Sequence, residues 1–344
     1  NAIQAVISLK TTYNIRVINL SLGRPVYESY EVDPLCQAVE QAWKAGIVVV
    51  VAAGNDGRDD FAGTSGYGTI TAPGNDPYVI TVGAMKQMGT ATRSDDLIAS
   101  YSSKGPTAID HIVKPDIVAP GNLVISLLGK SATHLQHSYP QNQVNKTYFV
   151  LSGTSMAAAV VSGSVADILQ AYPSITPDQV KAILMKSASK TFPQYSTTVD
   201  PLTGVSYVSQ YDVFTVGAGY LDLETAINMA STPPPSGASM ISPTAFYDSN
   251  SGNVYFVADS SSLWGNSAMW GSSAMWGSSA LWGSNVFVGT QSAMWGSSAL
   301  WGSSALWGSS TTSAFSALWG SSALWGSSSG DATESLNVAI NGEY

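Results

Sequence analysis

The chain has 344 residues, which suggests about two domains and gives ample material for a hydrophobic core. Charged residues make up only 11%, the formal net charge is -9, and no basic cluster is present, which argues against nucleic acid as a partner. The longest aliphatic run, residues 47–53, is far shorter than the roughly 20 residues that cross a bilayer, so we expect no membrane span. Cys36 is the one cysteine and lies among apolar positions, so we expect a buried thiol without redox chemistry.

Helical segments alternate with short aliphatic strands from residue 2 to about residue 230. The sequence predicts strands over residues 16–20, 47–53 and 78–84, and helices over residues 2–7, 33–45, 223–229 and from the 151–160 stretch to about residue 171. A further helix should begin after Thr176, which can cap it, with Pro177 at its first position and Gln179 completing a capping box. Apolar strands linked by helices predict an α/β fold with a mostly parallel sheet and helices on both faces.

A change of composition divides the chain after this domain. Residues 1–231 should form the α/β domain, and the Pro-rich stretch 232–240 is typical of a linker. Residues 241–344 carry a repeat, Trp-Gly-Ser-Ser-Ala followed by Leu or Met, with Trp at a period of six. That period gives no stripe on a helix, but it keeps every Trp on one face of an extended chain. A meander of short strands, a β-solenoid and a low-complexity spacer all fit, and an ordered tail could bind a surface polymer.

The stretch LSGTSMAAAV, residues 151–160, places Ser155 at the expected start of a helix. Unpaired backbone N–H groups and a partial positive charge there can stabilise an oxyanion beside the serine hydroxyl, although a plain helix cap is the alternative. The strand-to-helix elbow of an α/β-hydrolase needs glycine two residues after the serine and a downstream histidine. This chain has Ala157 there and no histidine after His137, whereas the subtilisin order of Asp, His and Ser requires only an upstream base.

Three segments closely resemble the subtilisin-like serine peptidases: Ile18–Gly23, Val48–Gly57 and Ser152–Ala157. Further matching segments follow in the family's order: Ala72–Gly74, Val79–Ala84, Tyr101–Pro106, Lys114–Gly121 and Gly217–Asp222. The resemblance covers about residues 2–230. It implies a serine endopeptidase that acts on polypeptide substrates through a covalent acyl-enzyme.

Carried over position by position, the resemblance implies that Ser155 is the nucleophile and that Asn55 is the oxyanion-hole donor, paired with the Ser155 backbone N–H. It implies that Ser21, Leu22 and Gly23 pair with the extended substrate by strand addition. Ala52, Ala53 and Gly54 would form the other wall of the primary specificity pocket. A cis peptide bond between Ala72 and Pro73 is also implied.

The base that would activate the serine is not evident in the sequence. His111, His134 and His137 are not followed by Gly-Thr and do not open an apparent helix, as the family's catalytic histidine does. We therefore expect the catalytic Asp and His upstream of residue 1, and the 344-residue chain alone to be inactive; a local histidine as base is the alternative.

Two other protein classes compete with this interpretation. The related sedolisins use an Asp in the oxyanion hole, so Asn55 favours the subtilisin branch. A non-catalytic surface or adhesive protein with a degenerate peptidase domain is the alternative function, and the intact Ser155 and Asn55 argue against it.

The family also implies a secreted or cell-surface location, although no signal peptide is visible in the sequence. No cofactor is required, and no complete metal motif is present. Structural calcium is frequent in the family, so either calcium ligands or solvated loop charges are expected at Asp56, Asp59, Asp60, Asp95 and Asp96. Residues 129–147 are longer and more polar than the family's loop before the serine; they either flank the leaving-group side of the cleft or form a plain surface loop.

Overall fold

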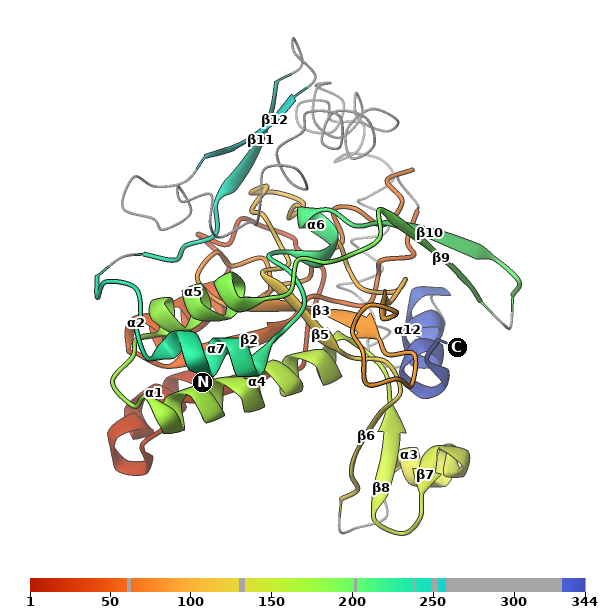
Figure 1. Ribbon diagram of the computed structural model, residues 1–344, viewed down its shortest axis with the longest axis horizontal. Coiled ribbons are helices and arrows are strands. Elements are labelled where there is room, and N and C mark those ends of the chain that lie inside the picture. The colour runs from red at the N-terminus through yellow and green to blue at the C-terminus, as the bar shows by residue number, and fades with distance from the viewer. Residues whose placement is uncertain are drawn as a thin grey trace.

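The computed structural model describes residues 1–60, 63–129, 134–200, 203–237, 239–248, 253–257 and 330–343. Within these ranges the fold is mixed α/β (Figure 1). The Trp repeats lie outside the described residues, so the predicted meander, solenoid and spacer all stay predictions.

Each predicted helix and strand is present, and the structure adds further elements that the sequence analysis did not predict. The helices are α1 (Ala2–Tyr13), α2 (Pro34–Lys44), α3 (His134–Ser138), α4 (Thr154–Ala171), α5 (Pro177–Ser187), α6 (Val213–Val216), α7 (Leu223–Ala230) and α12 (Gly330–Asn341). The strands are β1 (Val17–Leu20), β2 (Val48–Ala52), β3 (Ile80–Lys86), β4 (Leu97–Ile98), β5 (Ile117–Pro120), β6 (Val124–Leu127), β7 (Gln143–Val144), β8 (Tyr148–Leu151), β9 (Tyr195–Val199), β10 (Ser206–Gln210), β11 (Thr244–Asp248) and β12 (Asn253–Val257).

A five-stranded sheet forms the centre of the fold. Strands β1, β2 and β3 pair in parallel in that order, β5 pairs in parallel with β3, and β4 adds a short antiparallel edge. Every residue of β2 is buried, because its apolar run continues without alternation, as a strand covered on both faces requires. Helix α4 packs along β1, β2, β3 and β5, and α2 packs on β2 (Figure 1). The predicted parallel sheet is therefore confirmed.

Side-chain caps fix the starts of two predicted helices. Asp33 precedes α2 and accepts a hydrogen bond from the backbone N–H of Leu35 at 2.8 Å. Thr176 accepts from the N–H of Gln179 at 3.3 Å, and the Gln179 side chain accepts from the N–H of Thr176 at 2.9 Å. The capping box predicted for α5 is therefore confirmed.

The polar segment 129–147 contains more structure than a plain loop. In its described part, the chain forms α3, a single 3₁₀ turn at Pro140–Asn142 and β7. Strand β7 pairs with β8, which also pairs with β6, so the segment belongs to a small antiparallel sheet. Figure 1 shows β6 and β8 extending away from the central sheet.

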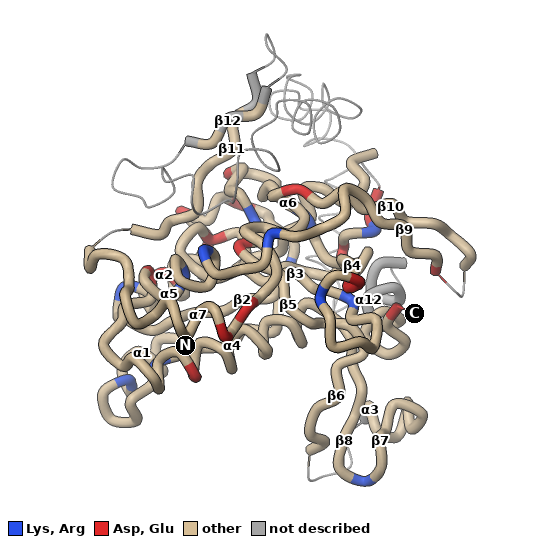
Figure 2. Tube along the Cα trace, in the orientation of Figure 1, with Lys and Arg blue, Asp and Glu red and all other residues tan. Residues whose placement is uncertain are grey.

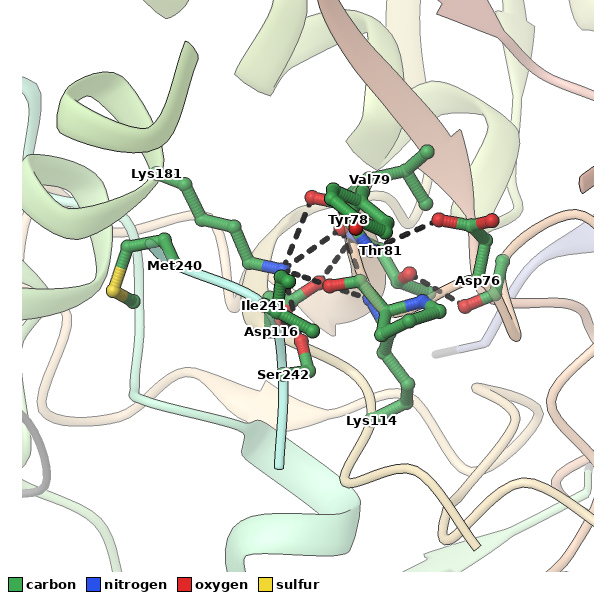
Figure 3. A network of polar contacts seen from close by, with 12 residues as sticks. Asp76, Tyr78, Val79, Thr81, Lys114, Asp116, Lys181, Met240, Ile241 and Ser242 are labelled. Carbon is green, nitrogen blue, oxygen red and sulfur yellow. Dashed lines mark hydrogen bonds and ion pairs between the residues drawn. The ribbon is translucent and has the colours of Figure 1, made fainter. Parts of the chain in front are cut away.

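Packing of the domain continues beyond the predicted boundary at residue 231. Met240 and Ala245 are 0% and 2% exposed, and Ala245 belongs to the main hydrophobic core. The hydroxyl of Ser242 lies 2.7 Å from Oδ1 of Asp116 and accepts a hydrogen bond from Nζ of Lys181 at 2.8 Å (Figure 3). Composition alone did not predict that residues 240–245 belong to the domain, because the partners of Ser242, Asp116 and Lys181, lie far away in the sequence.

The segment assigned to the end of the repeat tail also returns to the domain. Helix α12 contacts β8 (Figure 1), and Val338 belongs to the main hydrophobic core. The assignment of the whole range 241–344 to a separate tail therefore differs from the observed packing at both of its ends.

The distribution of charges and the hydropathy of the helices can be compared with the expectations from composition. Figure 2 shows Lys and Arg spread over several elements and interspersed with Asp and Glu. Within the described ranges, no helix is both long enough and apolar enough to span a membrane. Cys36 is fully buried, and burial raises the pKa of its thiol.

Candidate active site

Ser155 lies at the junction between β8 and α4. Gly153 occupies the N-cap position of α4, so Ser155 is the second helical residue and is not the cap. Gly153 has a φ of 142°, a backbone conformation that favours glycine, and a Cβ at this position would lie 3.3 Å from Nδ2 of Asn55. The backbone N–H groups of Met156 and Ala157 donate to the carbonyl of Gly153 at 3.0 and 3.4 Å. The N–H of Ser155 is therefore the group of this turn that can donate to a ligand beside the serine hydroxyl.

Asn55 reaches the same place from the end of β2. Its Oδ1 accepts hydrogen bonds from the backbone N–H of Thr154 at 2.9 Å and from the Thr154 hydroxyl at 3.0 Å. The amide oxygen therefore faces the helix start, which leaves Nδ2 as the group that can donate to a ligand. Thr154 Oγ1 also lies 3.1 Å from the N–H of Gly54, so it joins the end of β2 to the start of α4.

A third segment, at the end of β1, contacts the serine directly. The hydroxyl of Ser21 donates to the backbone carbonyl of Ser155 at 2.7 Å, and the Ser155 hydroxyl donates to the carbonyl of Ser21 at 3.4 Å. Asn19 supports this contact by donating from Nδ2 to the hydroxyl of Ser21 at 2.9 Å. The carboxyl ends of β1 and β2 thus meet the amino end of α4 at Ser155.

The two segments predicted to bind substrate lie on either side of Thr71. Ser21, Leu22 and Gly23 are exposed, and a Cβ on Gly23 would lie 2.3 Å from the hydroxyl oxygen of Thr71. The N–H of Thr71 donates to the carbonyl of Ala53 at 3.0 Å.

Ala52 and Ala53 are 4% and 0% exposed, and Gly54 has a φ of 112°. A Cβ on Gly54 would lie 2.6 Å from the hydroxyl of Ser103. Glycine is favoured at position 54 because its φ is positive and because the side chains of Ser103 and Thr71 occupy the space that a Cβ would fill. The structure therefore brings all eight sequence-predicted site residues into one region.

The two histidines whose side chains the structure describes, His111 and His137, do not join this group. Among the described residues, the hydrogen-bond partner of the Ser155 hydroxyl is the carbonyl of Ser21, and no described histidine side chain takes this place. His111 is held by its backbone, which bonds to Thr107 and Ala245, and burial lowers the pKa of its imidazole to about 4. His137 lies in α3, and the side chain of His134 is outside the described residues.

The expected cis peptide bond between Ala72 and Pro73 is present, together with cis bonds before Pro106 and Pro115. Among the described residues, no three His, Cys, Asp or Glu side chains gather as metal ligands. Asp60, Asp95 and Asp96 accept hydrogen bonds from nearby loop groups. Structural calcium stays a prediction.

The sequence analysis did not identify the residues that contact the glycines of the site and hold them in place. Thr71 and Ser103 pack against the glycines, and Gly121 accepts a hydrogen bond from the N–H of Gly153 at 2.8 Å. Their segments appear among the matched motifs, but nothing local in the sequence identifies these particular residues as supports.

Comparison with known sequences finds proteases among the relatives of this chain. The chain is 44% identical over 178 residues to the serine protease AprX of Bacillus subtilis (strain 168), covering 51% of this chain and 38% of AprX. It is 36% identical over 189 residues to subtilisin DY of Bacillus licheniformis, covering 55% of each chain. Among solved structures, the prenylagaramide maturation protease PagA matches with a TM-score of 0.43 and 23% identity, covering 66% of this chain and 65% of PagA.

The chain thus spans between about two fifths and just over half of the length of these two sequence relatives. The model of the Subtilase family matches residues 1–212, which is more than half of the chain. This match includes Ser155, Asn55 and both segments that flank Thr71. The chain belongs to the subtilase family of serine peptidases.

Proposed function

We propose that this chain is the nucleophile-bearing part of a secreted serine endopeptidase that hydrolyses peptide bonds through an acyl-enzyme on Ser155. The observation that carries the proposal is the meeting of Ser155 and Asn55 at the start of α4, joined by the two hydrogen bonds from Thr154 to Asn55 Oδ1. Membership of the subtilase family and a serine protease as relative support the same reaction class.

In this mechanism, a general base takes the hydroxyl proton of Ser155 while Oγ attacks the carbonyl carbon of the scissile bond. Negative charge then develops on the carbonyl oxygen, where Nδ2 of Asn55 and the backbone N–H of Ser155 donate hydrogen bonds. The partial positive charge at the start of α4 stabilises the same oxyanion. The amine leaves with a proton from the general acid, and water then hydrolyses the ester bond to Ser155.

The substrate would bind in extended form beside the exposed backbone of Ser21, Leu22 and Gly23. Addition of a strand there supplies main-chain hydrogen bonds that do not depend on the substrate's sequence. Ala52, Ala53 and Gly54 are proposed to form the opposite wall of the primary specificity pocket. Polypeptide is therefore the proposed substrate class.

The general base is proposed to come from Asp and His segments that precede residue 1 in the complete protein. A serine hydroxyl needs a base within roughly 2.6 to 3.2 Å. The described partner of the Ser155 hydroxyl is the carbonyl of Ser21, which cannot take a proton at neutral pH. The low pKa of His111 also makes it a weak base.

The test is peptide hydrolysis by the full-length protein that contains this chain. We expect hydrolysis of an unstructured polypeptide that is abolished by Ser155→Ala, with the melting temperature unchanged to within a few degrees because the residue is partly exposed. Full-length protein without hydrolytic activity, or with activity that survives Ser155→Ala, would overturn the proposal.

A further inference from the structure

Residues 330–343 pack against the peptidase domain as an internal part of it. Helix α12 contacts β8, the strand that leads to the nucleophile (Figure 1). Val338 and Ile340 are 2% and 4% exposed. Burial of two β-branched side chains favours the docked position of the segment.

The carboxylate of Glu343 is buried, with 2% of the residue exposed, and polar groups from two loops bind it. Nη2 of Arg58 lies 2.8 Å from Oε1, and the N–H and hydroxyl of Ser100 both donate to the carboxylate. Arg58 also pairs with Asp200 at 2.9 Å, so one guanidinium binds two carboxylates. A buried carboxylate requires such donors because it has lost its hydration, and the site therefore favours an acidic side chain at position 343.

The backbone of the returning segment is also bound specifically. The Asn122 side chain donates to the carbonyl of Glu343 at 2.7 Å and accepts from its N–H at 2.8 Å. Gly342 has a φ of 64°, and a Cβ there would lie 2.6 Å from Oγ of Ser152 and 2.7 Å from Cδ2 of Leu123. A side chain at position 342 would therefore displace the side chains of Ser152 and Leu123, and the positive φ would add backbone strain.

These contacts lie directly before the nucleophile's helix. The N–H of Ser152 donates to the carbonyl of Ala339 at 2.9 Å. The next N–H, that of Gly153, donates to the carbonyl of Gly121 at 2.8 Å, and Gly153 is the N-cap of α4. Ser155 follows two residues later, so the returning segment holds one end of the turn that presents the serine.

We propose that residues 338–343 form a latch that positions Ser155, with Glu343 as a positioning residue that acts through Ser152 and Gly153. The inference rests on the proposed role of Ser155 as nucleophile. Arg58, Ser100 and Asn122 form the receiving site of the latch on the peptidase domain.

The first test measures amide hydrogen exchange in the full-length protein and in three variants. Gly342→Ala should open the latch sterically, and Glu343→Gln should weaken it by removing the charge bound by Arg58. Val180→Ala is the control, because Val180 is fully buried in α5 and outside the latch. Both latch variants should speed exchange in residues 150–156 about tenfold or more through local opening, whereas the control should not. Faster amide exchange in residues 338–343 without any change in the exchange rates of residues 150–156 would overturn the inference.

The second test measures the rate at which a fluorophosphonate labels Ser155 in the same four proteins, together with kcat and KM for a peptide. Both latch variants should label about tenfold more slowly, equivalent to about 1.4 kcal/mol of transition-state stabilisation, with kcat lowered and KM little changed. Equal labelling of the latch variants and the wild type would contradict the positioning role. If the wild type does not label, the proposed function fails, and the exchange measurements still decide whether the latch holds residues 150–156.

Discussion

At the residue scale, Asn55 has two separable tasks. Its Oδ1 supports the start of α4 by accepting from Thr154, and its Nδ2 is available to an oxyanion. Asn55→Asp keeps the acceptor and removes the donor, whereas Asn55→Ala removes both. We expect both variants of the full-length protein to lose about 10² to 10³ in kcat, the magnitude measured for subtilisin itself and carried over by family membership.

Melting temperatures separate the two tasks of Asn55. Asn55→Ala should lower stability by about 1 kcal/mol, because the N–H of Thr154 loses its acceptor, whereas Asn55→Asp should stay near the wild type. An Asn55→Asp variant with undiminished kcat would exclude Nδ2 as the oxyanion donor.

The carboxyl of Asp76 gives a pH-dependent prediction at the same scale. Its Oδ1 accepts from the N–H of Tyr78 at 2.9 Å, while Oδ2 is buried without a described partner (Figure 3). Burial raises its pKa to about 7, although Lys114 and Lys181 act in the opposite direction. The folded state therefore binds more protons than the unfolded state between about pH 4 and pH 7, so this group's contribution to stability is present at low pH and is lost as the pH rises through 7.

Asp76→Asn removes that titration and keeps an oxygen for Tyr78. We expect the variant to gain stability relative to the wild type as the pH rises from 5 to 8, by at least about 1 kcal/mol, since one pKa unit corresponds to about 1.4 kcal/mol. Urea unfolding at the two pH values measures this difference. A gain that does not depend on pH would mean that Asp76 is ionised throughout.

The site residues differ in how far the sequence could predict them. Ser155 and Asn55 stand in local motifs whose chemistry is readable, so their proximity was expected and is observed. Glu343, Arg58 and Asn122 come from segments far apart in the chain, and each looks like an ordinary polar residue in its own segment. Only the folded structure shows that Arg58 and Asn122 both bind Glu343, and that the same returning segment bonds to Ser152 through Ala339.

At the element scale, the capping box of α5 offers a direct stability test. Thr176→Ala removes the oxygen that accepts from the N–H of Gln179 and should lower the free energy of unfolding by about 1 kcal/mol. Thr176→Ser is the matched control, because it keeps the hydroxyl. Urea unfolding of the two variants measures the difference, and equal stabilities would show that the cap contributes little.

Helices and central strands were predictable because their local patterns agree with their tertiary environment. The apolar run of β2 and the capped start of α5 each match the observed element to within about two residues. The segment 129–147 was not predictable in the same way, since β7 is only two residues long and depends on β8 as its partner. Helix α12 was overlooked because the neighbouring repeats dominated the composition of its region.

At the scale of the whole molecule, the domain needs residues beyond the linker. Lys181 and Asp116 are fully buried, and both lose the hydroxyl of Ser242 if the chain ends at residue 231. A full-length protein truncated there should be destabilised by several kcal/mol, since hydrogen bonds to charged groups contribute about 1.5 to 3 kcal/mol each and the core contact of Ala245 is also lost. Truncation after Val257 keeps both features and should cost less.

Urea midpoints of the two truncated forms and the whole protein provide the measurement. We expect the whole protein to be the most stable and the form ending at residue 231 the least. Equal midpoints would show that residues 240–257 and the latch add nothing to the stability of the domain.

The central claim is that Ser155 is a nucleophile whose base lies in upstream segments. The most direct measurement is fluorophosphonate labelling followed by mass spectrometric mapping. It is applied to residues 1–344 alone and to the same chain extended upstream through the segments proposed to carry the Asp and His. The account predicts stoichiometric labelling at Ser155 in the extended form, its loss in Ser155→Ala, and little labelling of residues 1–344 alone. Rapid labelling at Ser155 accompanied by peptide hydrolysis in the isolated 344-residue chain would contradict it and would point to a base within this chain.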